Sequence, residues 1–211
     1  QVTIRDPGEA AAAFAAIGSA PAILEGFVPF AFETSSVVAI GADGGFAAYD
    51  MPENEHRGGI LRWSRVPSRV APETARAAAG HARAIGEALG HVGILTIEWF
   101  AVADADAPGG IRLVANEIAP RVHNSGHWTQ DGAVTSQFEQ HVRAIAGWPL
   151  GSPSRTADVA MENLIGDAFG RWPELLANPA ARLHLYGKTE VRPGRKMAHV
   201  NWIAAPPAGP E

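Results

Sequence analysis

The sequence has 211 residues, of which 46% are hydrophobic and 18% charged, with a formal net charge of −5 and no cysteine. This composition is typical of a folded globular chain, and it excludes disulfides as well as cysteine-based metal or nucleophile chemistry. The mildly acidic balance gives no reason to expect nucleic acid or a membrane surface as a partner, and no apolar run reaches the length of a membrane span.

The N-terminal part predicts one helix and several short strands. Residues 7–18 are rich in alanine, with a proline at the start, a glutamate in the first turn and a glycine at the end, and they predict a helix. Residues 22–28 and 33–41 are apolar runs typical of strands, and an Asp-Gly-Gly turn predicts a hairpin from the second run into residues 46–49. Residues 51–59 are polar and irregular, so we expect a loop there.

The middle of the chain predicts a helix, a hairpin and a second helix. Residues 72–90 have a proline near the start and a glycine at the end of a helical pattern. A strong strand at 93–102 is followed by a turn rich in Asp, Pro and Gly, and then by a return strand at 111–117. Residues 134–147 predict the second helix. Its apolar positions are spaced for one face of the helix: Val134, Phe138, Val142 and Ile145.

The last part of the chain, after a linker-like stretch at 149–153, predicts a small β-rich unit. It contains a short helix at 172–177 and ends in a tail, 204–211, for which we expect disorder. The strands expected in this unit are 159–165, 183–186 and 197–202. The chain as a whole therefore predicts the α+β class, an antiparallel sheet with packed helices.

Two carboxylates of the central hairpin are expected to face each other. Glu98 and Glu117 are equidistant from the bond between Ala107 and Pro108, and directly opposed residues have Cβ atoms roughly 4.5–5.5 Å apart. Two such carboxylates repel unless one is protonated or a cation lies between them. With Asn116 they form an all-oxygen set that suits magnesium. Alternatively, the register slips by one residue and Glu98 faces solvent.

The segment that follows carries a cluster of hydrogen-bond donors. His123 and His127 are four residues apart, but they would share one face for zinc only in a helix, whereas the surrounding Pro, Asn, Ser and Gly residues predict a loop. Arg121, His123, Asn124 and Ser125 could instead hold a small oxyanion. The alternative is a turn in which Asn and Ser bond their own backbone.

A basic segment, residues 188–196, lies near the end of this net-acidic chain. It holds two lysines and two arginines around a Pro-Gly turn. Such a cluster can bind a phosphate monoester, or it can be a solvated loop.

Three stretches of the chain resemble a known family. They read N-E-I-A-P-R-V-H-N-S-G-H-W-T at 116–129, T-S-Q-F-E-Q-H at 135–141 and K-T-E-V-R-P-G-R-K-M-A-H at 188–199. Together they closely resemble 5-(carboxyamino)imidazole ribonucleotide synthase, an ATP-grasp enzyme of purine biosynthesis. The resemblance runs from Gln1 to about Trp202, and its first stretch is the most specific because it is long and unbroken.

The resemblance implies an ATP-dependent carboxylation with magnesium as cofactor. In this reaction ATP phosphorylates bicarbonate to carboxyphosphate, and the carboxyl group passes to the exocyclic amine of 5-aminoimidazole ribonucleotide, leaving ADP and phosphate. It also implies a cytoplasmic homodimer whose partners are these small molecules, without nucleic acid or membrane.

The resemblance further implies roles for individual residues. For the nucleotide these are Glu25, Gly26, Phe27 and Val28 at the adenine, Glu33 at the ribose, His56 nearby, and Asn116 and Glu117 at the phosphates. Glu98 and Glu117 match the magnesium carboxylates, and Arg121, His123 and Asn124 match the bicarbonate and carboxyphosphate pocket. Substrate-binding roles fall to Ser125 and to Lys188 and Arg195, the last two as a clamp on the ribonucleotide phosphate.

The chain departs from the family in lacking its N-terminal domain and the mobile glycine-rich loop over the ATP phosphates. We therefore expect a part of a longer protein, inactive alone. Its expected divisions are the remainder of the nucleotide-binding subdomain (1–65), the metal and catalytic subdomain (66–150) and the small C-terminal domain (151–211). Two alternatives stay open: another ATP-grasp ligase, such as a formate-dependent glycinamide ribonucleotide transformylase, and a non-catalytic nucleotide-binding fragment.

Overall fold

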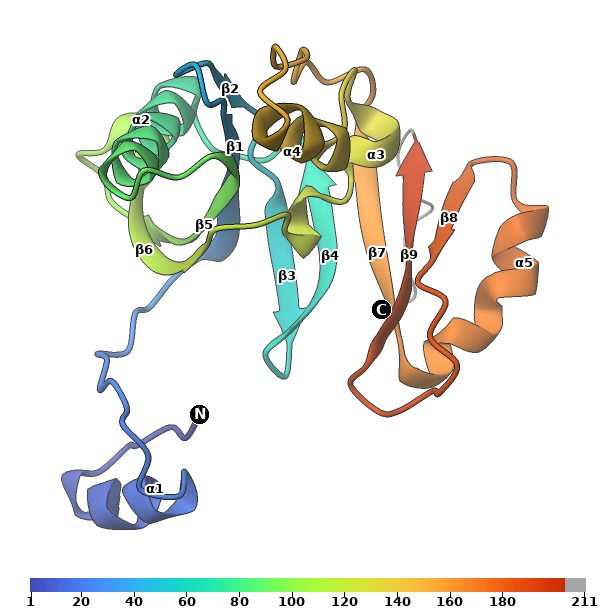
Figure 1. The fold of residues 1–211 in the computed structure, drawn as a ribbon. Coiled ribbons are helices and arrows are strands. Elements are labelled where there is room, and N and C mark those ends of the chain that lie inside the picture. Colours follow the sequence, from blue (N-terminus) through green and yellow to red (C-terminus); the bar gives the residue numbers. More distant parts are fainter. Residues whose placement is uncertain (204–211) are drawn as a thin grey trace.

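The computed structural model describes residues 1–203, and its central feature is a nine-stranded sheet in which paired strands run antiparallel. The order across the sheet is β6-β5-β1-β3-β4-β7-β9-β8, with β2 paired to β1 (Figure 1). The strands are β1 Phe32–Ile40, β2 Phe46–Ala48, β3 Glu53–Arg57, β4 Ile60–Val66, β5 Gly93–Ala103, β6 Ile111–Ala119, β7 Val159–Ile165, β8 Ala181–Leu185 and β9 Lys196–Ile203. The predicted α+β class is confirmed.

Helices cover both faces of the sheet. The longest, α2, packs against β1, β5 and β6, whereas α4 packs against the other face of β1 and β5. The helices are α1 Ala10–Ala16, α2 Pro72–Ala88, α3 Thr129–Gly132, α4 Gln137–Ile145 and α5 Trp172–Ala177, with short 3-10 turns at Pro7–Glu9, Pro108–Gly110, Asn124–Gly126 and Gly166–Arg171. Among the residues described, no helix is long and apolar enough to cross a bilayer.

Side-chain alternation along β1 and β5 separates two hydrophobic cores. Val38, Leu95 and Ile97 face α2, whereas Val37 and Ile94 face α3 and α4. The face that packs against α3 and α4 extends beyond these helices, and this part of it carries the polar residues of the candidate site. The sheet therefore has a buried apolar part under the helices and a polar part next to it.

Most of the predicted elements are confirmed with small shifts of their ends. The first predicted helix spans residues 7–16, and an Asp6–Glu9 capping box starts it. The predicted strand 159–165 and helix 172–177 have the predicted bounds. The last two predicted strands are β8 and β9, and the expected disordered tail, 204–211, lies outside the described residues.

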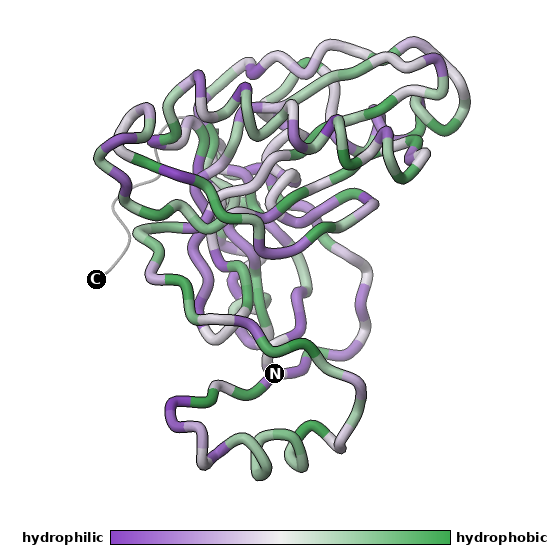
Figure 2. Tube along the Cα trace, turned by 90° about the vertical axis from the view of Figure 1, so that its left-hand side faces the viewer, coloured by the Kyte–Doolittle hydropathy of each residue, from purple (hydrophilic) through white to green (hydrophobic). Residues whose placement is uncertain are grey.

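The predicted strand at 22–28 is wrong. This segment has no regular secondary structure, and Ile23, Leu24 and Phe27 are each at least 80% exposed. Figures 1 and 2 show the N-terminal segment extending away from the sheet in both views. A β-branched or aromatic run becomes a strand only when a neighbouring strand forms hydrogen bonds with its backbone. None of the described strands pairs with residues 22–28.

The predicted loop at 51–59 is also wrong. It contains β3, which forms a hairpin with the unpredicted strand β4 through Gly58 and Gly59, both at positive φ. Polar residues fill both faces of β3: Glu53 and Glu55 pair with arginines at the surface, whereas Asn54 is buried. A strand without an apolar face gives no strand signal in the sequence.

The helix predicted at 134–147 is shorter, and its buried face is not the apolar one. α4 starts after the N-cap Ser136, and Val134, Val142 and Ile145 are exposed. The buried positions are instead Gln137, Gln140 and Ala144. The glutamines are buried at low cost because they bond backbone groups, as Gln140 does twice with Gly151 at 2.7 Å.

The C-terminal strands extend the same sheet. β7 pairs with β4, and β9 and β8 follow beyond it, with α5 packed against β8. The expected division at residue 151 stays a prediction, since the sheet is continuous across it. This continuity places residues of the basic segment near the central hairpin.

Candidate active site

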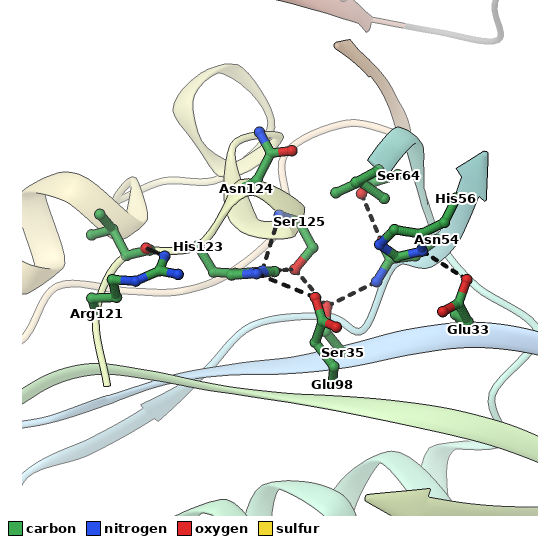
Figure 3. A network of polar contacts seen from close by, with 12 residues as sticks. Glu33, Ser35, Asn54, His56, Ser64, Glu98, Arg121, His123, Asn124 and Ser125 are labelled. Carbon is green, nitrogen blue, oxygen red and sulfur yellow. Dashed lines mark hydrogen bonds and ion pairs between the residues drawn. The ribbon is translucent and has the colours of Figure 1, made fainter. Parts of the chain in front are cut away.

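The site begins with carboxylates on the sheet face opposite α2. Ser35 on β1 pairs with Glu98 on β5, and Glu33 lies two residues before Ser35 on the same face. The neighbours of Glu98, Ile97 and Trp99, point into the α2 core. Strand alternation alone therefore turns Glu98 out of an otherwise apolar strand and into the site (Figure 3).

The predicted pairing of Glu98 with Glu117 is confirmed, but a bulge contributes to it. Near the turn, the pairs from Ala103–Ile111 to Trp99–Ala115 are centred on Ala107. A register shift then leaves Asn116 without a partner and brings Glu117 opposite Glu98. The two carboxylates consequently share one face of the hairpin, and the unpaired Asn116 lies directly between Ala115 and Glu117.

His123 reaches Glu98 from the loop above the sheet. Its Nε2 lies 3.2 Å from Glu98 Oε1, and its Nδ1 lies 2.8 Å from the Ser125 hydroxyl. Burial, together with the nearby charges of Arg121 and Lys196, lowers the pKa of His123 to about 4. The imidazole is therefore neutral at neutral pH and offers a hydrogen bond without a positive charge.

Glu98 lies in an environment with excess negative charge. Burial raises its pKa, and the carboxylates of Glu117 and Glu33 add to the rise against the opposing effects of His56 and Lys196. A cation beside Glu98 and Glu117 would relieve this repulsion. The oxygen donors present fit magnesium, although no group of three or more His, Asp or Glu residues suited to a metal occurs among residues 1–203.

Glu33 and His56 form a second polar pair in the site. His56 Nδ1 lies 2.7 Å from Glu33 Oε2, and both side chains are mostly buried. The pair joins β1 to β3, next to the Ser35–Glu98 pair (Figure 3). Both residues were predicted for the nucleotide, and the fold brings them to the same face as the carboxylates.

The oxyanion cluster is brought together only in part. The exposed Arg121 donates from Nη1 to the carbonyl of Val122 at 3.0 Å. Asn124 exchanges two amide hydrogen bonds, of 2.9 and 2.7 Å, with Asn163 on β7. Ser125 is fully buried, and its hydroxyl lies 2.8 Å from His123 Nδ1.

Other predicted residues lie apart from this group. The segment 25–28 is extended and mostly exposed. On the C-terminal side, the exposed Lys188 donates to the Lys196 carbonyl at 2.6 Å, and Arg195 donates to the Glu190 carbonyl at 3.0 Å. These two cations lie in one loop between β8 and β9, and the phosphate clamp predicted for them stays a prediction.

Two residues of the site were missed in the sequence. Burial lowers the pKa of Lys196, and this lysine acts electrostatically on both Glu98 and His123, so it belongs to the site. Asn163 is a polar residue inside the apolar strand β7, the same kind of interruption that singled out Glu98. That signal could have found Asn163, whereas Lys196 was hidden among the other cations of its loop.

The second histidine of the loop turns to different neighbours. His127 Nδ1 lies 2.9 Å from Gln137 Nε2, and its ring centroid lies 4.8 Å from that of His199. His199 in turn stacks on His184, which bonds Asp131 of α3 at 2.7 Å. We call His127, His184, His199 and Asp131 the imidazole cluster, and it joins α3 to β8 and β9.

Comparison with known families matches both parts of the chain. The model of the ATP-grasp domain matches residues 1–138, and that of the phosphoribosylaminoimidazole carboxylase C-terminal domain matches residues 159–208. The N5-carboxyaminoimidazole ribonucleotide synthase of Brucella melitensis is 50% identical over 198 residues, covering 94% of this chain and 53% of the relative.

Solved structures give the same picture. The N5-carboxyaminoimidazole ribonucleotide synthetase of Thermus thermophilus superposes with a TM-score of 0.86 at 45% identity, over 96% of this chain and 54% of that one. The Aspergillus clavatus N5-carboxyaminoimidazole synthase, solved with ADP and 5-aminoimidazole ribonucleotide, gives 0.76 at 30% identity, over 84% and 48%. The chain thus spans about half the length of the relatives it matches.

Proposed function

This chain belongs to the ATP-grasp family, and on that premise we propose that it forms part of an enzyme that carboxylates 5-aminoimidazole ribonucleotide with ATP and bicarbonate. The product would be 5-(carboxyamino)imidazole ribonucleotide, released with ADP and phosphate. The observation that carries the proposal is the opposed pair Glu98 and Glu117, with the neutral His123 bonded to one of them. Similarity to the Brucella and Thermus proteins across both matched parts supports the choice of reaction.

Magnesium is the cofactor that this oxygen set fits. Glu98 and Glu117 would hold it, with Asn116 at the bulge as a further oxygen donor. When bound, magnesium would neutralise the charge on the phosphate oxygens of ATP. The carboxylates themselves position the cation, and His123 orients Glu98 through its Nε2 contact.

The loop after β6 is proposed to hold the small anion. Arg121 offers a planar guanidinium for bicarbonate or carboxyphosphate, and the imidazole of His123 adds a neutral side chain to this pocket. Asn124 would take part only if it exchanged one of its bonds to Asn163 for the anion. Lys196 adds a positive charge close enough to act on Glu98 and His123.

The remaining predicted residues are proposed to bind ATP or the ribonucleotide substrate. Glu33 and His56 would bind the ribose side of ATP, and residues 25–28 would contact the adenine with backbone groups that are accessible in this structure. Lys188 and Arg195 would bind the phosphate of the ribonucleotide. An amine held between this clamp and the anion loop could then attack the carboxyl carbon of carboxyphosphate, expelling phosphate.

We also propose a homodimer and a cytoplasmic location. The dimer rests on the family resemblance, and its test is the molar mass in solution by light scattering. The lack of cysteine fits a reducing compartment.

The test is the substrate dependence of ATP hydrolysis by a full-length protein that contains this chain. We expect ADP to form only with magnesium and bicarbonate and to form faster when 5-aminoimidazole ribonucleotide is added. Labelled bicarbonate should appear in the product. If formate and glycinamide ribonucleotide stimulate the reaction instead, the protein is the sister transformylase; nucleotide binding without any turnover would mean a non-catalytic module.

A further inference from the structure

A row of buried hydroxyl and amide groups lies beneath His123. Ser64 Oγ lies 2.7 Å from Asn54 Oδ1, Asn54 Nδ2 lies 3.2 Å from Ser35 Oγ, and Ser35 Oγ lies 2.7 Å from Ser125 Oγ. Ser125 Oγ completes the row at His123 Nδ1 (Figure 3). Its members come from β4, β3, β1 and the loop after β6, so the row ties the loop to three strands.

The row has one direction. A hydroxyl has a single proton, so a serine that receives a hydrogen bond from one neighbour passes its own proton to the next. Asn54 donates to Ser35, Ser35 therefore donates to Ser125, and Ser125 donates to His123 Nδ1. A reversed amide at Asn54 would reverse every bond and place a proton on Nδ1.

A second, longer contact at His123 agrees with this direction. The backbone N–H of Ser125 also points at His123 Nδ1, at 3.3 Å, and caps the short 3-10 helix that starts there. A backbone N–H can only donate, so this contact favours an acceptor at Nδ1. At 3.3 Å it is longer than the 2.8 Å contact from the Ser125 hydroxyl, so the row has the larger effect on the tautomer. The proton of the neutral ring is then on Nε2, which lies 3.2 Å from Glu98 Oε1.

We propose that Ser35 and Asn54 are positioning residues that act through Ser125 to hold His123 as the Nε2–H tautomer, with its proton directed at Glu98. Neither residue needs to touch a substrate, since Ser35 is fully buried and Asn54 nearly so. His123 then gives its single N–H proton to the Glu98 carboxylate and does not serve as a base at Nε2. The positioning role of Ser35 and Asn54 rests on the proposed function. The tautomer of His123 does not depend on that function.

The strand β1 offers a matched control. Ser36 is as buried as Ser35 but points to the α2 face, where it accepts a hydrogen bond from Trp99 Nε1 at 2.8 Å. Ser35→Ala and Ser36→Ala therefore each remove one buried hydroxyl from the same strand. Only the first interrupts the row to His123.

The first test is the tautomer of His123, measured by long-range proton–nitrogen NMR on the 211-residue chain at pH 8, with His123→Gln to assign its signals. We expect an unprotonated Nδ1 in the wild type and in Ser36→Ala. Asn54→Asp replaces the donor by an acceptor, so it should reverse the row and protonate Nδ1. Ser35→Ala should give an averaged signal, and it keeps the test decisive if Asn54→Asp does not fold. A protonated Nδ1 in the wild type, or wild-type signals in every folded variant of the row, would overturn the proposal.

The second test measures turnover in the full-length protein. We expect Ser35→Ala to lower kcat by about tenfold with little change in KM for ATP. Losses of this size are typical of residues that orient a contacting side chain by a hydrogen bond. Ser36→Ala should change neither. An equal loss of kcat in both variants would mean that Ser35 has only a structural role. An inactive wild-type protein would contradict the proposed function but would leave the NMR result valid.

Discussion

His123 and His127 lie four residues apart on one loop, yet they belong to two regions with opposite balances of charge and partners. His123 faces Glu98 in a region where carboxylates accumulate and Lys196 is the half-buried cation among them. His127 lies against His199 in the imidazole cluster, where Asp131 receives hydrogen bonds from both His184 and Asn201. The first region keeps an electrostatic imbalance that a ligand would relieve. In the second the carboxylate of Asp131 is paired, whereas His199 Nε2 and Asn201 Oδ1 are buried without a hydrogen-bond partner.

This difference predicts that the surroundings of His123 serve function, whereas those of His127 serve stability. Variants near His123 should lose activity while the chain stays folded. Variants near His127 should destabilise the joint between α3 and the C-terminal strands. The predictions below test this division, beginning with the largest expected effect.

Glu98→Gln in a full-length protein should lower turnover by about a thousandfold, or about 4 kcal/mol in the activation free energy, because one of two magnesium carboxylates is lost. The chain itself should be no less stable, since burial already raises the pKa of Glu98 and its charge opposes folding. Steady-state kinetics and urea unfolding measure the two effects. Glu117→Gln should likewise abolish magnesium-dependent turnover.

The control for both is Glu139→Gln on the exposed side of α4. It should leave turnover unchanged. If Glu98→Gln retained more than a tenth of the activity, the carboxylate pair would not be a metal site.

His199→Ala should destabilise the chain by about 3 kcal/mol, since it opens a cavity between stacked rings and removes the bond to the Tyr186 hydroxyl. The free energy of unfolding, measured with urea, checks this. His81→Ala on the exposed face of α2 is the control and should cost little. A loss below about 1 kcal/mol would mean that the imidazole cluster does not hold the joint together.

Acid should weaken the same joint. Burial lowers the pKa of His127 to about 3 and that of His199 to about 2, both below the value of about 6.5 in the unfolded chain. The unfolded state therefore binds more protons below pH 6.5, and each histidine removes about 1.4 kcal/mol of stability per pH unit as the pH falls. By pH 5 the loss is about 2 kcal/mol for each.

Unfolding curves between pH 8 and 5 measure this slope, which should be flat above about pH 7. His199→Gln should reduce the slope of stability against pH by the contribution of one histidine. His123 contributes in the same direction, because its pKa is also lowered by burial. Stability that did not change across this range would show that the rings are not held neutral.

Lys188→Ala should have the smallest effect, a rise of about tenfold in KM for the ribonucleotide with little change in KM for ATP. The reason is the loss of one cation of the proposed phosphate clamp beside Arg195. Initial rates with each substrate varied in turn give the two constants. Arg76→Ala on α2 controls for the loss of a surface charge, and equal rises for both substrates would argue against a clamp.

Local patterns in the sequence predicted the parts of the site that one hairpin can position. Glu98 and Glu117 were expected to face each other from turn symmetry alone, and they do, although the bulge at Asn116 supplies the last shift of register. The helices at 72–90 and 172–177 and the strand at 159–165 were predicted because proline starts, glycine ends and apolar runs act over a few residues.

Other local signals failed where a partner was needed. The apolar run at 22–28 is no strand because no described strand pairs with it, and the polar stretch at 53–57 is one because two neighbours pair with it. In α4 Val142 and Ile145 are exposed and two glutamines are buried, since only the fold offers those glutamines backbone partners.

The sequence by itself determined the local hairpin that opposes the carboxylates and the motifs that mark the family. Only the tertiary structure decided that His123 and His127 part to different regions, that Asn124 meets Asn163 across 39 residues, and that Ser35 meets Ser125 across 90. The physical reason is range. Periodicity and turn chemistry act between neighbours in the chain, whereas the proton on His123 depends on buried groups gathered from three strands and a loop.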